Sequence, residues 1–223
     1  MKTFIVLCVG ALLFGASAVS ARCHRGWQGP PPAADRYDRP YDAPKTESWY
    51  LDLGLGYSDI AHPRAVRQAI DGFKGTADVR HAPVNLDLGV YFPTDVRSAF
   101  GVSLAGIGDR YERGDAWAQV SHGTIGLTGM HFFGPAIGQG LYVRGDAGLA
   151  AATWETSAGD KAKSKVGWSV LVGGGYSFRI LPGTRLMLGA NYRHAKVKED
   201  PTSANPVGLG PTSSVNFNLG LLF

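Results

Sequence analysis

Eight stretches of this chain alternate between apolar side chains and polar or small ones with a period of two residues. The first begins at Trp49, and the last ends at Phe223, the final residue of the sequence. Successive side chains of a β-strand point to opposite faces, so each stretch predicts a strand with one apolar face. One such stretch alone is a weak signal because its phase can be chosen freely. Eight in succession predict an all-β fold.

The spacing between these stretches predicts how the strands are joined. Three connections are short, and each contains a proline: Pro93, Pro135 or Pro182. The others are longer, at about 59–83, 109–116, 155–166 and 196–212. Short turns at one end, long loops at the other and an even number of strands are typical of a bacterial outer-membrane barrel.

The two faces of the strands differ in a way that favours lipid outside the barrel. Aromatic residues bracket the apolar faces, with Trp49 and Tyr57 on one strand and Trp168 and Phe178 on another. This placement fits an apolar band between two aromatic girdles. The opposite faces are rich in glycine and carry charges, whereas a soluble ligand-binding barrel would have apolar residues inside. The sequence therefore predicts an eight-stranded antiparallel up-and-down transmembrane β-barrel.

Four charged residues fall at mid-strand on the predicted inner face: Asp52, Asp87, Arg144 and Asp146. Each lies a few residues from the same end of its strand, so we expect them to form one layer across the lumen. Arg193 lies nearer the other end and is expected outside that layer. The layer could line a gated ion path or form a structural salt-bridge plug. We favour the plug, because buried charges need partners and an eight-stranded barrel is narrow.

The N-terminal part of the chain has a different texture. Lys2, the apolar run 4–14 and the small residues that follow predict a signal peptide over residues 1–21, cleaved between Ala21 and Arg22. Residues 22–47 hold five prolines and no apolar period, which predicts a disordered, proline-rich periplasmic arm before a barrel over 48–223. Removing the signal peptide leaves Cys23 as a single thiol, so no internal disulfide is expected.

The last strand carries the most specific pattern in the chain. Apolar residues occupy every second position up to the C-terminus: Val215, Phe217, Leu219, Leu221 and Phe223. With the seven preceding strands, this pattern resembles the small outer-membrane β-barrel family typified by OmpA transmembrane domains and OmpX. The resemblance covers about residues 48–223.

The resemblance implies a location and partners. In that family the terminal pattern is the assembly signal recognised by the outer-membrane insertion machinery. The resemblance therefore implies a Gram-negative outer-membrane protein with both termini in the periplasm and four loops outside, in contact with outer-membrane lipid and lipopolysaccharide. A monomer is expected.

Enzymatic and cofactor chemistry find little support in the residues. His194 lies on the lipid-facing parity, which resembles the catalytic histidine of outer-membrane lipid A deacylases. That family has a serine two residues later, where this chain has Lys196, so no nucleophile is visible. The six histidines are scattered, and no metal or cofactor motif appears. The net charge of +4 is spread thinly, which argues against nucleic-acid binding.

Two features of the predicted loops remain open. After Pro63, residues 64–73 place apolar side chains at helical spacing, which predicts a short helix that packs on the barrel rim or contacts a partner. Five lysines in the third and fourth loops could bind lipopolysaccharide phosphates or be simply solvated: Lys161, Lys163, Lys165, Lys196 and Lys198. The sequence thus predicts a non-enzymatic barrel with a structural or surface-interaction role. The alternatives are a narrow channel and, with less support, a lipid A-modifying enzyme.

Overall fold

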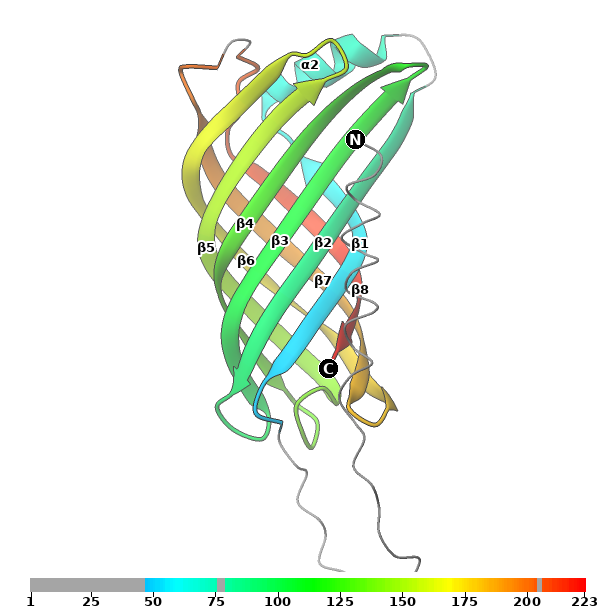
Figure 1. Cartoon of the computed structure of the whole chain (residues 1–223), viewed down its shortest axis with the longest axis vertical. Helices are drawn as coiled ribbons and strands as arrows, with labels where there is room; N and C mark the ends of the chain where they lie inside the picture. Colours follow the sequence, from blue (N-terminus) through cyan, green and yellow to red (C-terminus); the bar gives the residue numbers. More distant parts are fainter. Residues whose placement is uncertain (1–46, 76–78, 204–205) are drawn as a thin grey trace, which may run out of the picture. The chain divides into compact units, whose positions relative to one another are not determined.

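The computed structural model describes residues 47–75, 79–203 and 206–223, so the predicted signal peptide, almost all of the proline-rich arm and Cys23 lie outside the described residues. Eight strands run antiparallel to their neighbours, and β8 pairs with β1 to close the barrel (Figure 1). They are β1 (Tyr50–Ala61), β2 (Arg80–Pro93), β3 (Ser98–Arg113), β4 (Ala116–Phe132), β5 (Gly140–Thr156), β6 (Lys161–Leu181), β7 (Thr184–Glu199) and β8 (Thr212–Leu222). The predicted fold class is confirmed.

The C-terminal residue takes part in closing the barrel. The amide of Leu51 donates to the carbonyl of Phe223 at 3.2 Å, and the amide of Phe223 donates to the carbonyl of Leu51 at 3.0 Å. Strand β8 pairs with β1 on one side and β7 on the other. Its backbone groups are therefore satisfied inside the sheet, as a strand in lipid requires.

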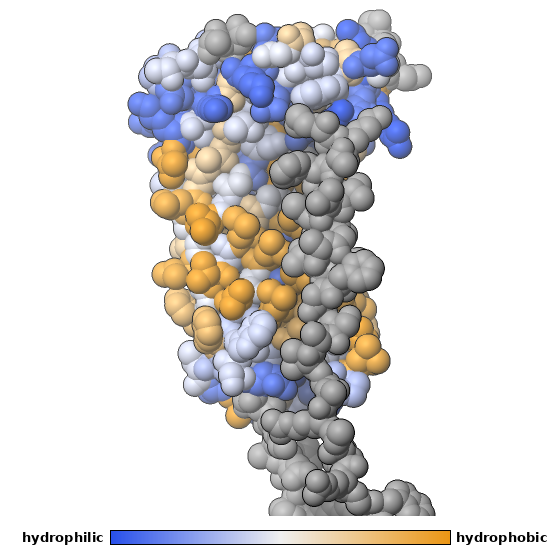
Figure 2. Space-filling view, in the orientation of Figure 1, coloured by the Kyte–Doolittle hydropathy of each residue, from blue (hydrophilic) through white to orange (hydrophobic). Residues whose placement is uncertain are grey.

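The outward face of the barrel is apolar across its middle. Leu55, Leu104, Leu127, Val172 and Leu219 are among the large apolar side chains that are half exposed or more. On the face that Figure 2 shows, hydrophobic residues form an orange band across the middle of the barrel, with hydrophilic residues gathered above it. The inward positions alternate with them and include polar groups such as Asn216, which is 1% exposed. This inverted distribution is the one that a barrel surrounded by lipid needs.

The connections differ from the expectation at two places. The predicted loops at 109–116 and 155–166 are largely strand, because β3 and β4 are joined by residues 114–115 and β5 and β6 by residues 157–160. Here the strands continue past the apolar band, so their outward side chains become polar while the backbone ladder persists. Alternating hydrophobicity marks only the lipid-facing part of a strand, and it therefore underestimated strand length. We call this end of the barrel, which carries the helix α2 (Arg64–Lys74), the α2 end and the opposite end the turn end.

The predicted helix forms as α2 (Arg64–Lys74) at the end of the barrel that Figure 1 shows uppermost. Val66 and Ile70, one turn apart, are 0% and 3% exposed and pack into an apolar cluster with the inward side chains of the strands. The Lys74 ammonium lies 4.7 Å from the ring centre of Tyr111 on β3. The structure therefore favours rim packing over a free surface helix. No helix among the described residues is long and apolar enough to cross a membrane.

Candidate functional site

The lumen is filled at the turn end by an apolar layer, which we call the basal layer. Its members are Tyr50, Tyr91, Ala99, Met130, Phe132, Ile137, Tyr142, Met187 and Leu222. Ile137 comes from the 133–139 connection, which folds into the barrel mouth. Its amide donates to the carbonyl of Val96 at 2.9 Å, and the Ser177 hydroxyl donates to the carbonyl of Gly138 at 2.8 Å. Bulky side chains thus close this end.

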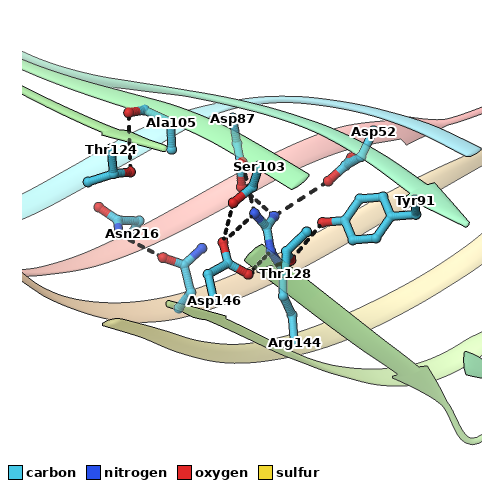
Figure 3. A network of polar contacts seen from close by, with 11 residues as sticks. Asp52, Asp87, Tyr91, Ser103, Ala105, Thr124, Thr128, Arg144, Asp146 and Asn216 are labelled. Carbon is cyan, nitrogen blue, oxygen red and sulfur yellow. Dashed lines mark hydrogen bonds and ion pairs between the residues drawn. The ribbon is translucent and has the colours of Figure 1, made fainter. Parts of the chain in front are cut away.

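The four charged residues predicted to share a layer are brought together on the α2 side of the basal layer (Figure 3). Arg144 binds Asp87 through both terminal nitrogens, with Nη2 3.0 Å from Oδ1. It binds Asp146 through Nε at 2.9 Å and Nη2 at 2.7 Å. Nη1 also lies 3.5 Å from Oδ2 of Asp52. We call this set the central network; the guanidinium donates four hydrogen bonds, two to Asp87 and two to Asp146, and forms a longer ion pair with Asp52.

Neutral side chains support one part of this network. The hydroxyls of Thr128 and Ser103 donate to Asp146, and the Ser103 bond is 3.1 Å long. Asp52 and Asp87 have no such hydroxyl donors among the described residues. The side chains of Asp87 and Arg144 are 4% and 6% exposed, so these charges are desolvated and depend on one another. Three carboxylates therefore share one guanidinium.

Amide and hydroxyl side chains fill the next level of the lumen. The Ser58 hydroxyl donates to Oδ1 of Asn216 at 2.6 Å, and Nδ2 of Asn85 donates to the Ser58 hydroxyl at 3.0 Å. Nδ2 of Asn216 donates in turn to Oδ1 of Asn191 at 2.7 Å. This chain of bonds joins β1, β2, β7 and β8. Arg193 is also buried in the lumen but forms no hydrogen bond with the central network in the described residues.

A histidine–aspartate cluster below α2 was not predicted from the sequence. Asp109, whose side chain is 3% exposed, accepts hydrogen bonds from Nε2 of His62 at 2.6 Å, from Nε2 of His81 and from the hydroxyl of Tyr111 at 2.9 Å. His62 also stacks on His122, with ring centres 6.2 Å apart. His62 directly precedes Pro63, so the cluster ties the start of the α2 segment to the barrel wall. The inward parity of Asp109 was the available signal, but residue spacing could not show its partners.

The space left between these layers is small. A cavity of about 20 Å³ borders Asp52, Asp87, Arg144 and Tyr142, which is room for about one water molecule. No group of three or more His, Cys, Asp or Glu in the described part of the chain is arranged to hold a metal ion. The lumen is therefore a packed interior with a charged layer.

One polar pair on the outward face corrects the sequence argument about a missing hydroxyl. Nδ1 of His194 lies 2.9 Å from the hydroxyl of Ser213, which faces it across the β7–β8 ladder. The hydroxyl of Tyr192 donates to the same Ser213 oxygen at 3.0 Å. The nearest hydroxyl therefore comes from the neighbouring strand, which a search along β7 alone could not find. No carboxylate among the described residues bonds to His194.

A closed antiparallel barrel with an apolar outer band and a polar, packed lumen defines an integral membrane β-barrel. The eight strands, the short turns at one end and the terminal strand give this chain the fold of the small bacterial outer-membrane barrels typified by OmpA transmembrane domains and OmpX.

Comparison with known proteins adds structural likenesses only. No family model and no curated protein matches the sequence. Among solved structures, the chain is similar to Neisserial surface protein A at 13% identity, over 79% of this chain and 96% of that one, with a TM-score of 0.49. It is also similar to Ail of Yersinia pestis, at 12% identity over 79% and 100% of the two chains and a TM-score of 0.46. For the outer membrane protein AlkL the values are 13% identity, 83% and 94% coverage and a TM-score of 0.44.

Proposed function

We propose that this protein is a monomeric outer-membrane barrel with a closed lumen and a structural or surface-interaction role at its α2 end. The observation that carries the proposal is the order of packed layers across the lumen. From the turn end these are the basal layer, the central network, the hydrogen-bonded side chains around Asn216, and the apolar and histidine–aspartate clusters beneath α2. Each layer is held by contacts between several strands. A solute path would have to break them in series, so the packing supports a scaffold over a channel.

The orientation follows from the lengths of the connections: two of those at the α2 end are long, at 62–79 and 200–211, whereas the longest at the turn end is 133–139. Outer-membrane barrels keep short turns on the periplasmic side and longer loops outside. We therefore assign the turn end and both termini to the periplasm and the α2 end to the cell exterior. Assembly by the outer-membrane insertion machinery, read from Val215, Phe217, Leu219, Leu221 and Phe223, belongs to the same proposal. So does contact with outer-membrane lipid and lipopolysaccharide.

Planar-bilayer recordings test the closed lumen. We expect wild-type protein to give no steady conductance, or brief and small openings only. A steady, large single-channel conductance would contradict the proposal. Heat-modifiable gel mobility of the same preparation confirms that the recorded protein is folded.

One observation favours a second candidate, hydrolysis of an acyl ester in the surrounding lipid. The His194–Ser213 pair has the separation of a base and a hydroxyl nucleophile and faces outward. No carboxylate in the described part of the chain orients the histidine, so the scaffold remains our conclusion. Mass spectrometry of lipid A decides between them. Identical profiles with wild type, Ser213→Ala and no protein would exclude the enzymatic alternative.

A further inference from the structure

Five exposed lysines lie side by side on the outside of β6 and β7 near the α2 end: Lys161, Lys163, Lys165, Lys196 and Lys198. Lys165 faces Lys198 directly across the ladder, and Lys196 faces Trp168. Two like charges opposite each other in a sheet destabilise it unless an anion lies between or beside them. This surface therefore has the charge pattern of an anion site.

A β-bulge in β6 is what turns the lysines outward. On the turn-end side of the bulge, the even-numbered residues of β6 face outward, as Trp168 does. Between Lys165 and Trp168, β6 advances three residues while β7 advances two. The extra residue reverses the alternation, so that Lys163 and Lys165 are exposed and Ala162 is buried in the apolar cluster.

The bulge depends on a glycine. A Cβ atom on Gly167 would lie 2.0 Å from the carbonyl oxygen of Lys196, closer than any side chain allows. In a regular strand the three lysines of β6 would point into the apolar interior instead, where unpaired charges are strongly unfavourable. The bulge thus places the lysines on the surface beside those of β7.

The acidic groups near these lysines are already engaged. Lys161 pairs with Glu155 at 3.4 Å, but the other four lysines form no ion pair within the described residues. The Glu199 carboxylate accepts the backbone amides of Val207 and Gly208, both at 2.8 Å. Hydrogen bonds from the backbone amide and hydroxyl of Thr202 hold the pKa of Asp200 below its ordinary value, with a smaller contribution from Lys165. Asp200 and Glu199 stay ionised and offset part of the positive charge, but neither forms an ion pair with the four lysines within the described residues, so four cations against two anions leave the surface positive and the ammonium groups open to a ligand.

The order of side chains along this face matches a phosphate-bearing lipid. Going toward the α2 end, apolar Val170 and Val172 are followed by Trp168 beside His194, and then by the lysines. Apolar, aromatic and cationic groups in this order fit acyl chains, the interface and phosphate, respectively. A soluble anion would need no apolar and aromatic surface below the cations.

We propose that Lys163, Lys165, Lys196 and Lys198 bind the phosphate groups of an anionic lipid in the surrounding leaflet. With the orientation proposed above, on which this inference rests, that lipid is lipopolysaccharide. The bulge at Gly167 and the aromatic pair beneath the lysines shape the site.

Native mass spectrometry of the folded full chain, released from micelles of zwitterionic detergent and titrated with bisphosphorylated lipid A, tests this site. Lys165→Gln with Lys198→Gln is expected to weaken binding about thirtyfold, because each cation near an anionic lipid contributes about fivefold. The matched control is Arg64→Gln with Arg67→Gln, which removes two exposed cations from α2 and is expected to leave binding within about twofold. Lys165→Arg with Lys198→Arg should retain binding.

Three results would overturn the inference: unchanged binding by the glutamine pair, equal binding of dephosphorylated lipid A, or full displacement of lipid A by millimolar inorganic phosphate. Labelling of Gln68→Cys, an exposed position on α2, with a membrane-impermeant maleimide on intact cells tests the orientation separately, because this position lies outside the lysine set. Failure to label it would contradict the proposed orientation, whereas a labelled Gln68→Cys together with unaltered lipid binding by the glutamine pair would contradict the phosphate site alone.

Discussion

Replacing Arg144 with alanine is expected to destabilise the barrel by about 3–5 kcal/mol, the usual effect of removing one partner of a buried ion pair. Arg144 makes both hydrogen bonds to Asp87 and the 3.5 Å ion pair with Asp52. After the substitution Asp146 keeps Thr128 and Ser103, while the other two carboxylates lose their partner. Two orphaned groups at about 1–3 kcal/mol each, or more when charged, give a similar sum.

The loss of stability caused by Arg144→Ala should depend on pH. Protonating the orphaned carboxylates removes the unpaired negative charges, so the variant should approach wild-type stability as the pH falls and be least stable at alkaline pH. Guanidinium unfolding in detergent micelles, followed by tryptophan fluorescence and gel mobility, measures the difference at each pH.

A variant without any charge in the central network separates the effect of unpaired carboxylates from the effect of the smaller side chain at position 144. Arg144→Met combined with Asp52→Asn, Asp87→Asn and Asp146→Asn removes every charge of the central network while retaining similar volume. Buried ion networks replaced as a unit are often no less stable than the originals, so this variant should recover most of the loss. If Arg144→Ala were as stable as the wild-type protein, or if its loss of stability did not depend on pH, the conclusion that the ion pairs of the central network stabilise the barrel would be refuted.

Three other predictions concern helix α2, the strand glycines and the histidine–aspartate cluster. Ile70→Asp should detach and unfold α2 and make the chain susceptible to trypsin after Arg64 and Arg67, because Ile70 is 3% exposed and its burial contributes about 1.5–3 kcal/mol, whereas Gln68→Asp at an exposed position of the same helix should not. Gly101→Val should lower the folded fraction on heat-modifiability gels, since a Cβ there would lie 1.8 Å from the Val90 carbonyl oxygen; Gly123→Val, with open space around it, should fold normally. Asp109→Asn should lower stability by about 1–3 kcal/mol, because one amide oxygen cannot accept from His62, His81 and Tyr111 together, while exposed Asp59→Asn should have little effect in the same guanidinium titration.

The architecture could be predicted because lipid imposes a strict period on the residues that face it. Leu53, Leu55 and Tyr57 mark β1 as clearly as Phe217, Leu219 and Leu221 mark β8, and the two strands pair as the closing seam. The proximity of the four inward charges could also be predicted. Parity gives the face of a residue, and distance from the strand end gives its level in the lumen.

Partners across strands could not be predicted in the same way. Ser213 meets His194 only because the 200–211 connection sets the register of β7 against β8, and that register is invisible in either strand alone. The bulge before Trp168 similarly reversed the alternation of β6 without any break in the sequence pattern. A one-residue register shift moves every following side chain to the other face, so these features depend on the backbone ladder rather than on residue type.

The hydrogen bonds and ion pairs inside the barrel determine which of its residues are free to bind a ligand. Lipid outside the barrel places the polar residues in a narrow lumen, where a polar group without a partner is unfavourable. Arg144 is shared by three carboxylates, Asn216 is bonded on both sides, and Asp109 accepts from three side chains. These interior groups are occupied in holding the strands together. By contrast, Lys163, Lys165, Lys196 and Lys198 form no ion pair with the described residues, and the outer surface of the α2 end is open to solvent, so recognition by this barrel is expected at its surface.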